Sequence, residues 1–267
     1  MRRGFQTFTC VVLAVALAFM CCPYAALSQE GRGAPGAAGM GAPGAVQAGP
    51  SALVYKPPMR GAPAGGGRIA AAVRGAEGDA LVLIALAPDH VGVTSQSQPV
   101  LYWYISKPTS SRIEFSLNDE LKSQTLFKTE LAAPKKGGIL EIKLADYNVE
   151  LSAGVVYQWF VSVEADPGQP AKDVYNGGSI VYQEPSPDLK KRVASAGSAG
   201  AAGIYAGEGL WYDALTATWK AGKSGEEKLA RPLRISLLKQ VGFGVPDTGK
   251  PKSALDGEEE VLHFLDK

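Results

Sequence analysis

Between residues 80 and 185 the chain repeats short apolar segments, and several of them alternate hydrophobic with polar positions. The clearest segment places Ile113, Phe115 and Leu117 between polar residues. A period of two is typical of half-buried β-strands, and turn-forming residues such as Asn176–Gly178 separate the segments. Expected strands cover residues 80–87, 100–105, 111–117, 124–131, 139–144, 151–163 and 177–183. No convincing helix interrupts them, so the pattern predicts an antiparallel β-sandwich rather than a parallel sheet.

One stretch predicts how a strand enters this sandwich. It carries Leu151, Gly154 and Tyr157, a spacing that resembles the tyrosine corner of immunoglobulin-like and fibronectin-type sandwiches. In such a corner the tyrosine hydroxyl forms a hydrogen bond with backbone a few residues upstream. The residues that then fall on one face of the strand are Val155, Tyr157, Trp159, Val161 and Val163. The predicted fold is therefore mainly β, an immunoglobulin/fibronectin-like antiparallel β-sandwich.

The strand at residues 100–105 is apolar on both of its faces. A sandwich strand normally has one face toward solvent, so a second layer must cover Tyr102 and Tyr104. We expect C-terminal helices to provide that layer. The alternative is a partner protein, because exposed aromatic patches mark binding surfaces. The candidate partner surface comprises Tyr102, Tyr104, Trp211 and Tyr212.

After residue 185 the pattern becomes helical, which adds an α-helical C-terminal extension to the predicted fold. Ser186, Pro187 and Asp188 form a typical helix start. The small and aromatic residues from Ala201 to Ala214 are spaced as in the helix-turn-helix core of a tetratricopeptide repeat. A single such unit cannot bury its own face, so we expect a lone helical hairpin docked on the sandwich. A last helix is expected over residues 232–241.

The N-terminal region has the features of an export signal. Residues 1–28 combine Arg2 and Arg3, a short apolar core and a small-residue cleavage site, which predicts a signal peptide. Residues 29–67 are rich in Gly, Ala and Pro and predict a disordered spacer. Export and the absence of a later membrane span indicate the periplasm or cell envelope of a Gram-negative bacterium.

Cysteine and charge exclude several classes of function. The cysteines Cys10, Cys21 and Cys22 all lie in the predicted signal, so the mature chain has no thiol for a disulfide, a metal or nucleophilic catalysis. The chain has 27 basic and 26 acidic residues, and loss of Arg2 and Arg3 leaves 25 against 26. This balance gives no reason to expect nucleic acid or an anionic membrane as a partner.

The remaining polar residues suggest no catalytic, cofactor-binding or metal site. The two histidines are His90, expected in a solvated turn, and His263, expected in the C-terminal tail. No motif places a nucleophile beside them. Asp213 falls in the first turn of an expected helix, where it would complement the helix dipole. The acids available for a paired-carboxylate mechanism are Asp119, Glu120, Glu164 and Asp213, and their pattern does not rise above that of solvated residues.

Several motifs together resemble a bacterial exported family called domain of unknown function 928. They are Pro57–Pro63 followed by Gly67-Arg68, the apolar strand Leu83–Pro88, Pro99–Tyr104, Phe115–Glu120, the corner Leu151–Trp159, Gly209–Leu215 and Leu237–Gly242. The resemblance spans about Pro57 to Phe243. It implies no activity and no catalytic residues, because the family is named for its lack of a known function.

The expected organisation is a signal peptide at 1–28, a spacer at 29–67, the β-sandwich at 68–185, a helical extension packed on it at 186–243 and a flexible tail at 244–267. The tail could also form a short amphipathic helix that docks on a partner. The functional hypothesis is a non-enzymatic exported binding or structural module with a protein partner in the envelope. The alternatives are an envelope-polymer hydrolase that uses paired carboxylates, and a subunit of a sensory or secretion assembly that contacts partners through the helical hairpin.

Overall fold

The computed structural model describes residues 53–58, 68–70, 81–164, 173–244 and 252–267. The predicted signal peptide at 1–28 and most of the predicted spacer at 29–67 lie outside these ranges. No helix within the described ranges is long and apolar enough to cross a membrane. The described residues form two β-sheets and a group of helices, which confirms a mainly β fold with additional helices.

The larger sheet has six strands in the order β1-β9-β8-β5-β6, and β3 pairs with β9 outside this path. Its strands are β1 (Ile69–Ala70), β3 (Gly92–Thr94), β5 (Ile113–Asp119), β6 (Gln124–Leu131), β8 (Val156–Val163) and β9 (Val174–Tyr182). Alternation along β8 buries Tyr157, Trp159, Val161 and Val163 on one face, as predicted. The pairing of β3 with β9 is parallel and differs from the expected antiparallel pattern.

The predicted corner before β8 is present. The backbone N–H of Ser152 donates a hydrogen bond to the hydroxyl of Tyr157 at 3.2 Å. Leu151 is buried, and its own N–H donates to the carbonyl of Ser97 at 2.8 Å. The corner therefore fastens the start of β8 to the loop between β3 and β4, and this loop carries part of the site described below.

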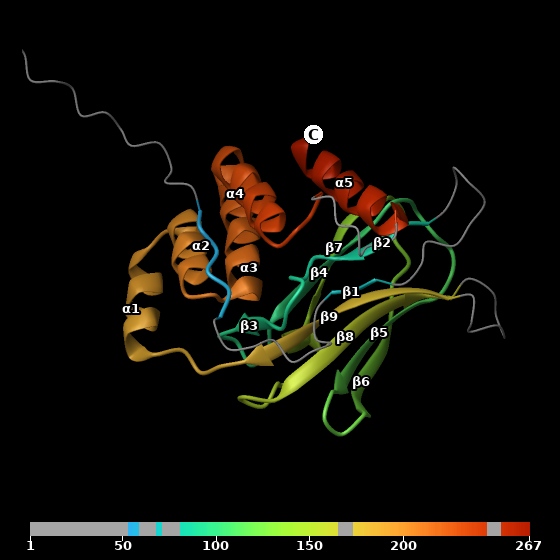
Figure 1. Ribbon diagram of the computed structural model, residues 1–267, viewed down its shortest axis with the longest axis horizontal. Coiled ribbons are helices and arrows are strands. Elements are labelled where there is room, and N and C mark those ends of the chain that lie inside the picture. Colours follow the sequence, from blue (N-terminus) through green and yellow to red (C-terminus); the bar gives the residue numbers. More distant parts are fainter. Residues whose placement is uncertain (1–52, 59–67, 71–80, 165–172, 245–251) are drawn as a thin grey trace, which may run out of the picture. The chain divides into compact units, whose positions relative to one another are not determined.

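The smaller sheet has three strands in the order β2-β4-β7. These are β2 (Leu83–Ala85), β4 (Val100–Ile105) and β7 (Gly138–Lys143), the last followed by the 3-10 helix η1 (Leu144–Tyr147). In Figure 1 this sheet lies between the helices and the larger sheet. A buried hydrogen bond from the N–H of Ala85 to the side-chain oxygen of Asn176 at 3.0 Å joins the two sheets.

Asn176, Gly177 and Gly178 lie inside β9, so their interpretation as turn residues is wrong. The two glycines are required by packing. A Cβ on Gly178 would lie 2.4 Å from the Cβ of Ala87, and one on Gly177 would lie 2.0 Å from the carbonyl oxygen of Trp159. Only glycine allows the neighbouring chain segments to approach β9 so closely.

The described α-helices all follow β9 in the chain. They are α1 (Pro187–Ser195), α2 (Ser198–Gly207), α3 (Trp211–Ala221), α4 (Glu227–Gln240) and α5 (Lys252–Asp266), with a π-helical segment at Gly222–Glu226. Ser186 caps α1 by accepting a hydrogen bond from the N–H of Leu189 at 3.1 Å, as predicted. The turn between α2 and α3 uses Gly209 with φ +74°, and α3 packs against α2, β3 and β4.

The last helix corrects the expectation of a flexible tail. Helix α5 buries Val261 and Leu265 in the main core and packs against α4 and β2. Its Phe264 lies 5.5 Å from Tyr104, measured between ring centroids, and the Tyr104 hydroxyl donates to Glu260 at 2.8 Å. The acidic run of the expected tail is therefore only partly solvated: Glu259 is exposed, whereas Glu258 is buried and pairs with Arg68 at 3.0 Å.

Candidate functional site

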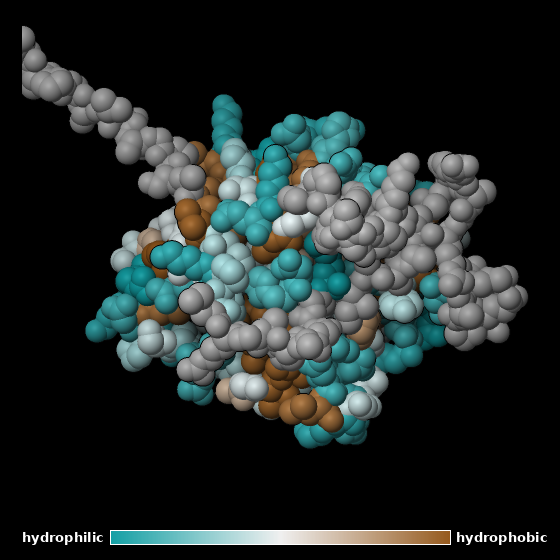
Figure 2. All heavy atoms as spheres, in the orientation of Figure 1, coloured by the Kyte–Doolittle hydropathy of each residue, from teal (hydrophilic) through white to brown (hydrophobic). Residues whose placement is uncertain are grey.

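The four aromatic residues proposed as a partner surface are buried, so that prediction is wrong for the folded chain. Tyr102 stacks on Trp219 of α3 at 5.7 Å between ring centroids, and Tyr104 lies under α5. The preferred expectation, that C-terminal helices cover the second face of β4, is confirmed. On the face of the molecule in Figure 2, the described hydrophobic residues form separate groups among hydrophilic ones.

Trp211 and Tyr212 fix the start of α3 to the sheets. The indole N–H of Trp159 donates to the Tyr212 hydroxyl at 3.0 Å, and that hydroxyl donates to the carbonyl of Ser179 at 3.0 Å. The indole N–H of Trp211 donates to the carbonyl of Leu86 at 3.2 Å. Because both side chains are fully enclosed, the first turn of α3 has one fixed position. This places the next residue, Asp213, against the β3–β4 loop.

Asp213 is the centre of a buried polar cluster. One carboxylate oxygen accepts the N–H of Ser95 at 2.9 Å, and the other accepts the Ser95 hydroxyl at 2.7 Å and the Gln96 amide at 3.4 Å. Burial raises the pKa of Asp213, while the hydrogen bonds from Ser95, Thr94 and Gln96 act in the opposite direction. We call these four residues the Asp213 cluster.

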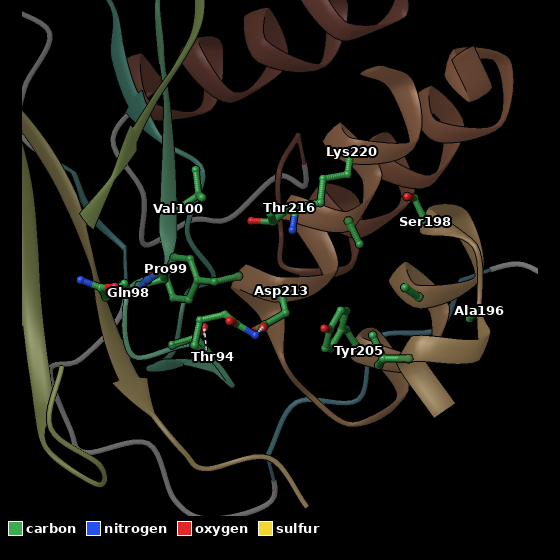
Figure 3. Close-up of a pocket in the computed structure, with 15 residues that line it drawn as sticks. Thr94, Gln98, Pro99, Val100, Ala196, Ser198, Tyr205, Asp213, Thr216 and Lys220 are labelled. Carbon is green, nitrogen blue, oxygen red and sulfur yellow. Dashed lines mark hydrogen bonds between the residues drawn. The ribbon is translucent and has the colours of Figure 1, made fainter. Parts of the chain in front are cut away.

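A cavity of about 320 Å³ opens beside this cluster, between the β3–β4 loop and helices α1, α2 and α3 (Figure 3). It is named the α1–α3 cavity. Its residues are Thr94, Gln96, Gln98, Pro99, Val100, Val193, Ala196, Ser198, Ala201, Tyr205, Tyr212, Asp213, Thr216, Ala217 and Lys220. Ligand sites typically occupy about 300–1,000 Å³ and combine apolar walls with a few fixed polar groups. The α1–α3 cavity has both features.

A second hollow of about 420 Å³ adjoins the first. The two share Gln96, Val193 and Tyr205, so Tyr205 stands between them. We call the second one the outer hollow. It lies along α1 and includes Ser97, Tyr182 and Lys190. We call the two adjoining hollows together the groove, and the Asp213 cluster lies beside it.

The histidines differ in their surroundings. His263 is exposed on α5, whereas His90 is not the solvated turn residue that the sequence suggested. The Tyr55 hydroxyl lies 2.8 Å from one ring nitrogen of His90, and the Asp89 carboxylate lies 3.1 Å from the other. Burial raises the pKa of Tyr55 above its usual range, so this hydroxyl keeps its proton. These hydrogen bonds, which link Asp89, His90 and Tyr55, therefore anchor the segment at residues 53–58 rather than supplying a nucleophile.

The acids considered for a paired-carboxylate mechanism lie in three places: Asp119 and Glu120 at the end of β5, Glu164 just after β8 and Asp213 on α3. Asp119 ends β5 and forms an ion pair with Lys122 at 2.9 Å, and this contact lowers the pKa of Asp119. Glu120 accepts a hydrogen bond from the Gln158 amide at 3.4 Å. Asp213 is on α3, with its oxygens occupied by the cluster. Among the described residues, no group of three or more His, Cys, Asp or Glu side chains converges.

Sequence reasoning identified Asp213 but missed its partners. Ser95 and Gln96 lie 118 and 117 positions away along the chain, and no periodic pattern connects them with α3. A usable signal was present in the polar run from Thr94 to Gln98, which precedes a strand that is apolar on both faces. Polar residues next to such a strand tend to be enclosed with it, and enclosed polar groups require partners.

The fold and the groove define a class of two-sheet domain with a helix-walled polar cavity. Within that class, the chain belongs to the family described as Domain of Unknown Function (DUF928), whose model matches residues 69–248. This match confirms the resemblance drawn from the sequence motifs. Among proteins with curated descriptions, none matches the chain.

Proposed function

We propose that the chain is a non-enzymatic binding module of the bacterial cell envelope, and that its ligand occupies the α1–α3 cavity. The observation that carries the proposal is the cavity itself. It is large enough for a small ligand, and its polar floor is held in place by the Asp213 cluster. Fixed polar groups within small apolar walls give orientation and selectivity to a bound molecule.

The groups that line the cavity support binding rather than catalysis. Its acid, Asp213, already accepts hydrogen bonds on both oxygens. Burial is the main cause that raises the pKa of Tyr205, with a smaller contribution from the charge of Asp213, so its hydroxyl stays protonated. The other polar lining residues carry amides, hydroxyls and one ammonium group. These groups hold a ligand by hydrogen bonds without an activated nucleophile.

We also propose that the domain is an immunoglobulin/fibronectin-like sandwich and that the chain is exported. The tyrosine corner formed by Ser152 and Tyr157 supports an immunoglobulin/fibronectin-like sandwich. The charged and apolar pattern of residues 1–28 supports export to the periplasm or envelope. The sandwich would then present its groove to envelope components.

The proposal is tested by binding to the purified full chain. Fractions of small molecules, glycans and peptides from a bacterial envelope extract are screened for an increase in melting temperature. Ser198→Trp places an indole in the α1–α3 cavity, and Ser195→Trp is the matched control, because Ser195 is exposed and borders neither hollow. At least one fraction should stabilise the wild type and the Ser195 variant but not the Ser198 variant.

Two results would contradict the proposal. One is that no fraction raises the melting temperature of the wild type. The other is that Ser198→Trp, folded by circular dichroism, responds to every active fraction as strongly as Ser195→Trp does.

A further inference from the structure

The groove has an uncompensated positive charge. The charged residues along its two hollows are Asp213, Lys190 and Lys220. The carboxylate of Asp213 is buried and engaged by Ser95 and Gln96, whereas both lysines are exposed. Neither ammonium group forms an ion pair with another residue in the described part of the chain. The charge that a ligand meets in the groove is therefore cationic.

The two lysines lie in different hollows. Lys220 is on α3, one turn after Thr216, and Figure 3 shows both side chains at the same edge of the α1–α3 cavity. Lys190 is on α1 and borders the outer hollow. The hollows adjoin at Gln96 and Tyr205, so an elongated ligand that crosses the Tyr205 side chain would occupy both and place an anionic group near each lysine.

The uncharged groups between the lysines indicate the kind of elongated ligand. The amides of Gln96 and Gln98 and the hydroxyl of Thr216 can each donate and accept hydrogen bonds, which matches a molecule rich in hydroxyl groups. The ring of Tyr205, placed where the hollows meet, offers a flat apolar face for the C–H side of a sugar ring.

The groove suits a peptide less well. Extended peptides are commonly bound by adding a strand to an open sheet edge, or as a helix in an apolar groove. Here the walls are mainly helices α1, α2 and α3 together with the β3–β4 loop, and most of the polar groups that line them belong to side chains. The groove therefore offers a ligand mainly side-chain contacts, which do not require an extended peptide backbone.

We propose that the groove binds an anionic oligosaccharide, with sugar units in both hollows and acidic groups near Lys190 and Lys220. The inference rests on the proposed binding function and names its ligand class. The shared chemistry is a sugar chain bearing carboxylate or sulfate groups, and the probes below distinguish these two.

The test is isothermal titration of the full chain with four defined probes. They are a trimer of galacturonic acid, a trimer of sulfated galactose, the neutral galactose trimer and triglutamate. At least one acidic sugar should bind more tightly than the neutral trimer and triglutamate. Lys190→Gln and Lys220→Gln should each weaken its binding roughly 2- to 5-fold, as expected for loss of one exposed charge contact. Lys191→Gln is the control, because Lys191 is exposed on α1 but borders neither hollow.

The outcomes separate this inference from the function on which it rests. Equal affinities of the Lys190, Lys220 and Lys191 variants for the acidic sugar, or no binding of either acidic sugar, would overturn the inference. Tighter binding of triglutamate or of the neutral trimer would also overturn it. In any of these cases, if Ser198→Trp abolishes binding of whichever ligand is bound and the lysine variants do not, the binding function itself stands. Binding that Ser198→Trp does not affect would contradict both the ligand class and the proposed binding function.

Discussion

Replacing Asp213 should show how strongly its cluster holds the β3–β4 loop against α3. Asp213→Ala removes the acceptor of two donors from Ser95, its N–H and its hydroxyl. A buried donor without an acceptor costs about 1–3 kcal/mol. The hydroxyl can turn to another acceptor and water can enter from the adjacent cavity, so the full cost of both is not reached. We expect a loss of about 2–4 kcal/mol in the free energy of unfolding.

Asp213→Asn is the matched variant, because it keeps the shape and one acceptor. The amide oxygen can accept the N–H of Ser95, and the Ser95 hydroxyl can rotate to accept from the amide nitrogen. The expected loss is within about 1 kcal/mol. Both variants are measured by urea unfolding followed by tryptophan fluorescence and circular dichroism, with the wild type in parallel.

The stabilities of the wild type and of Asp213→Asn should also depend differently on pH. Burial raises the pKa of Asp213, so the folded state holds this proton more tightly than the unfolded state. The resulting stability is fully present below the unfolded pKa of about 3.9 and is lost as pH rises through the folded pKa. Asparagine does not titrate. The stability of the wild type relative to Asp213→Asn should therefore fall as pH is raised from about 3.5 to 7.

Two results would refute this reasoning. One is an Asp213→Ala variant with the same unfolding free energy as the wild type, which would mean that the cluster does not support the loop. The other is a wild-type advantage over Asp213→Asn that grows with pH, which would mean that the folded site prefers the charged carboxylate.

Other substitutions test separate parts of the fold by the same unfolding assay. Gly203→Ala should stabilise by about 0.5–1 kcal/mol, because a Cβ there meets nothing within 4 Å and alanine favours helix; a loss would contradict the open position. Gly178→Ala should cost about 1–3 kcal/mol by overpacking, since its Cβ would lie 2.4 Å from a neighbouring carbon, and an unchanged stability would argue against that contact. Tyr157→Phe should cost about 1 kcal/mol by removing the hydrogen bond of the corner, and an unchanged melting point would count against it. Val261→Ala should cost about 1–3 kcal/mol because Val261 is fully buried, whereas a free C-terminal segment would show no loss.

Much of the larger sheet could be predicted because its strands are long and one face is buried. In β5 the buried residues Ile113, Phe115 and Leu117 alternate with less buried ones, so the pattern in the sequence is the burial pattern of the structure. The corner at Tyr157 was also predictable, because all of its parts lie within a few residues. Local constraints of this kind can be read directly from a sequence.

The missed features depend on contacts between distant segments. Strands β1 and β3 have two and three residues, which is too short for any period to appear. The glycines in β9 are required by packing against other segments, and glycine alone does not distinguish this from a turn. For the C-terminal tail the sequence allowed a short amphipathic helix only as an alternative that docks on a partner, whereas α5 buries Val261 and Leu265 in the core of its own chain.

The candidate site was predictable only in part, for the same reason. The first turn of α3 could be located around Asp213. The expected role of this carboxylate, to complement the helix dipole, does not require it to be buried. The polar floor arises where Thr94 and Gln96 meet α3, and the outer hollow arises where α1 passes the same loop. A cavity is a property of how elements pack, so neither hollow has a signature in the sequence.

The most direct test of the account is to locate the bound ligand on the protein. The isotope-labelled chain is titrated with an active envelope fraction while backbone amide signals are followed by NMR. A ligand in the α1–α3 cavity should shift the signals of Gln96, Ser198 and Thr216 and leave that of Thr129 on β6 unchanged. Shifts centred on β6, or on any surface away from helices α1 to α3, would contradict the assignment of the cavity as the binding site.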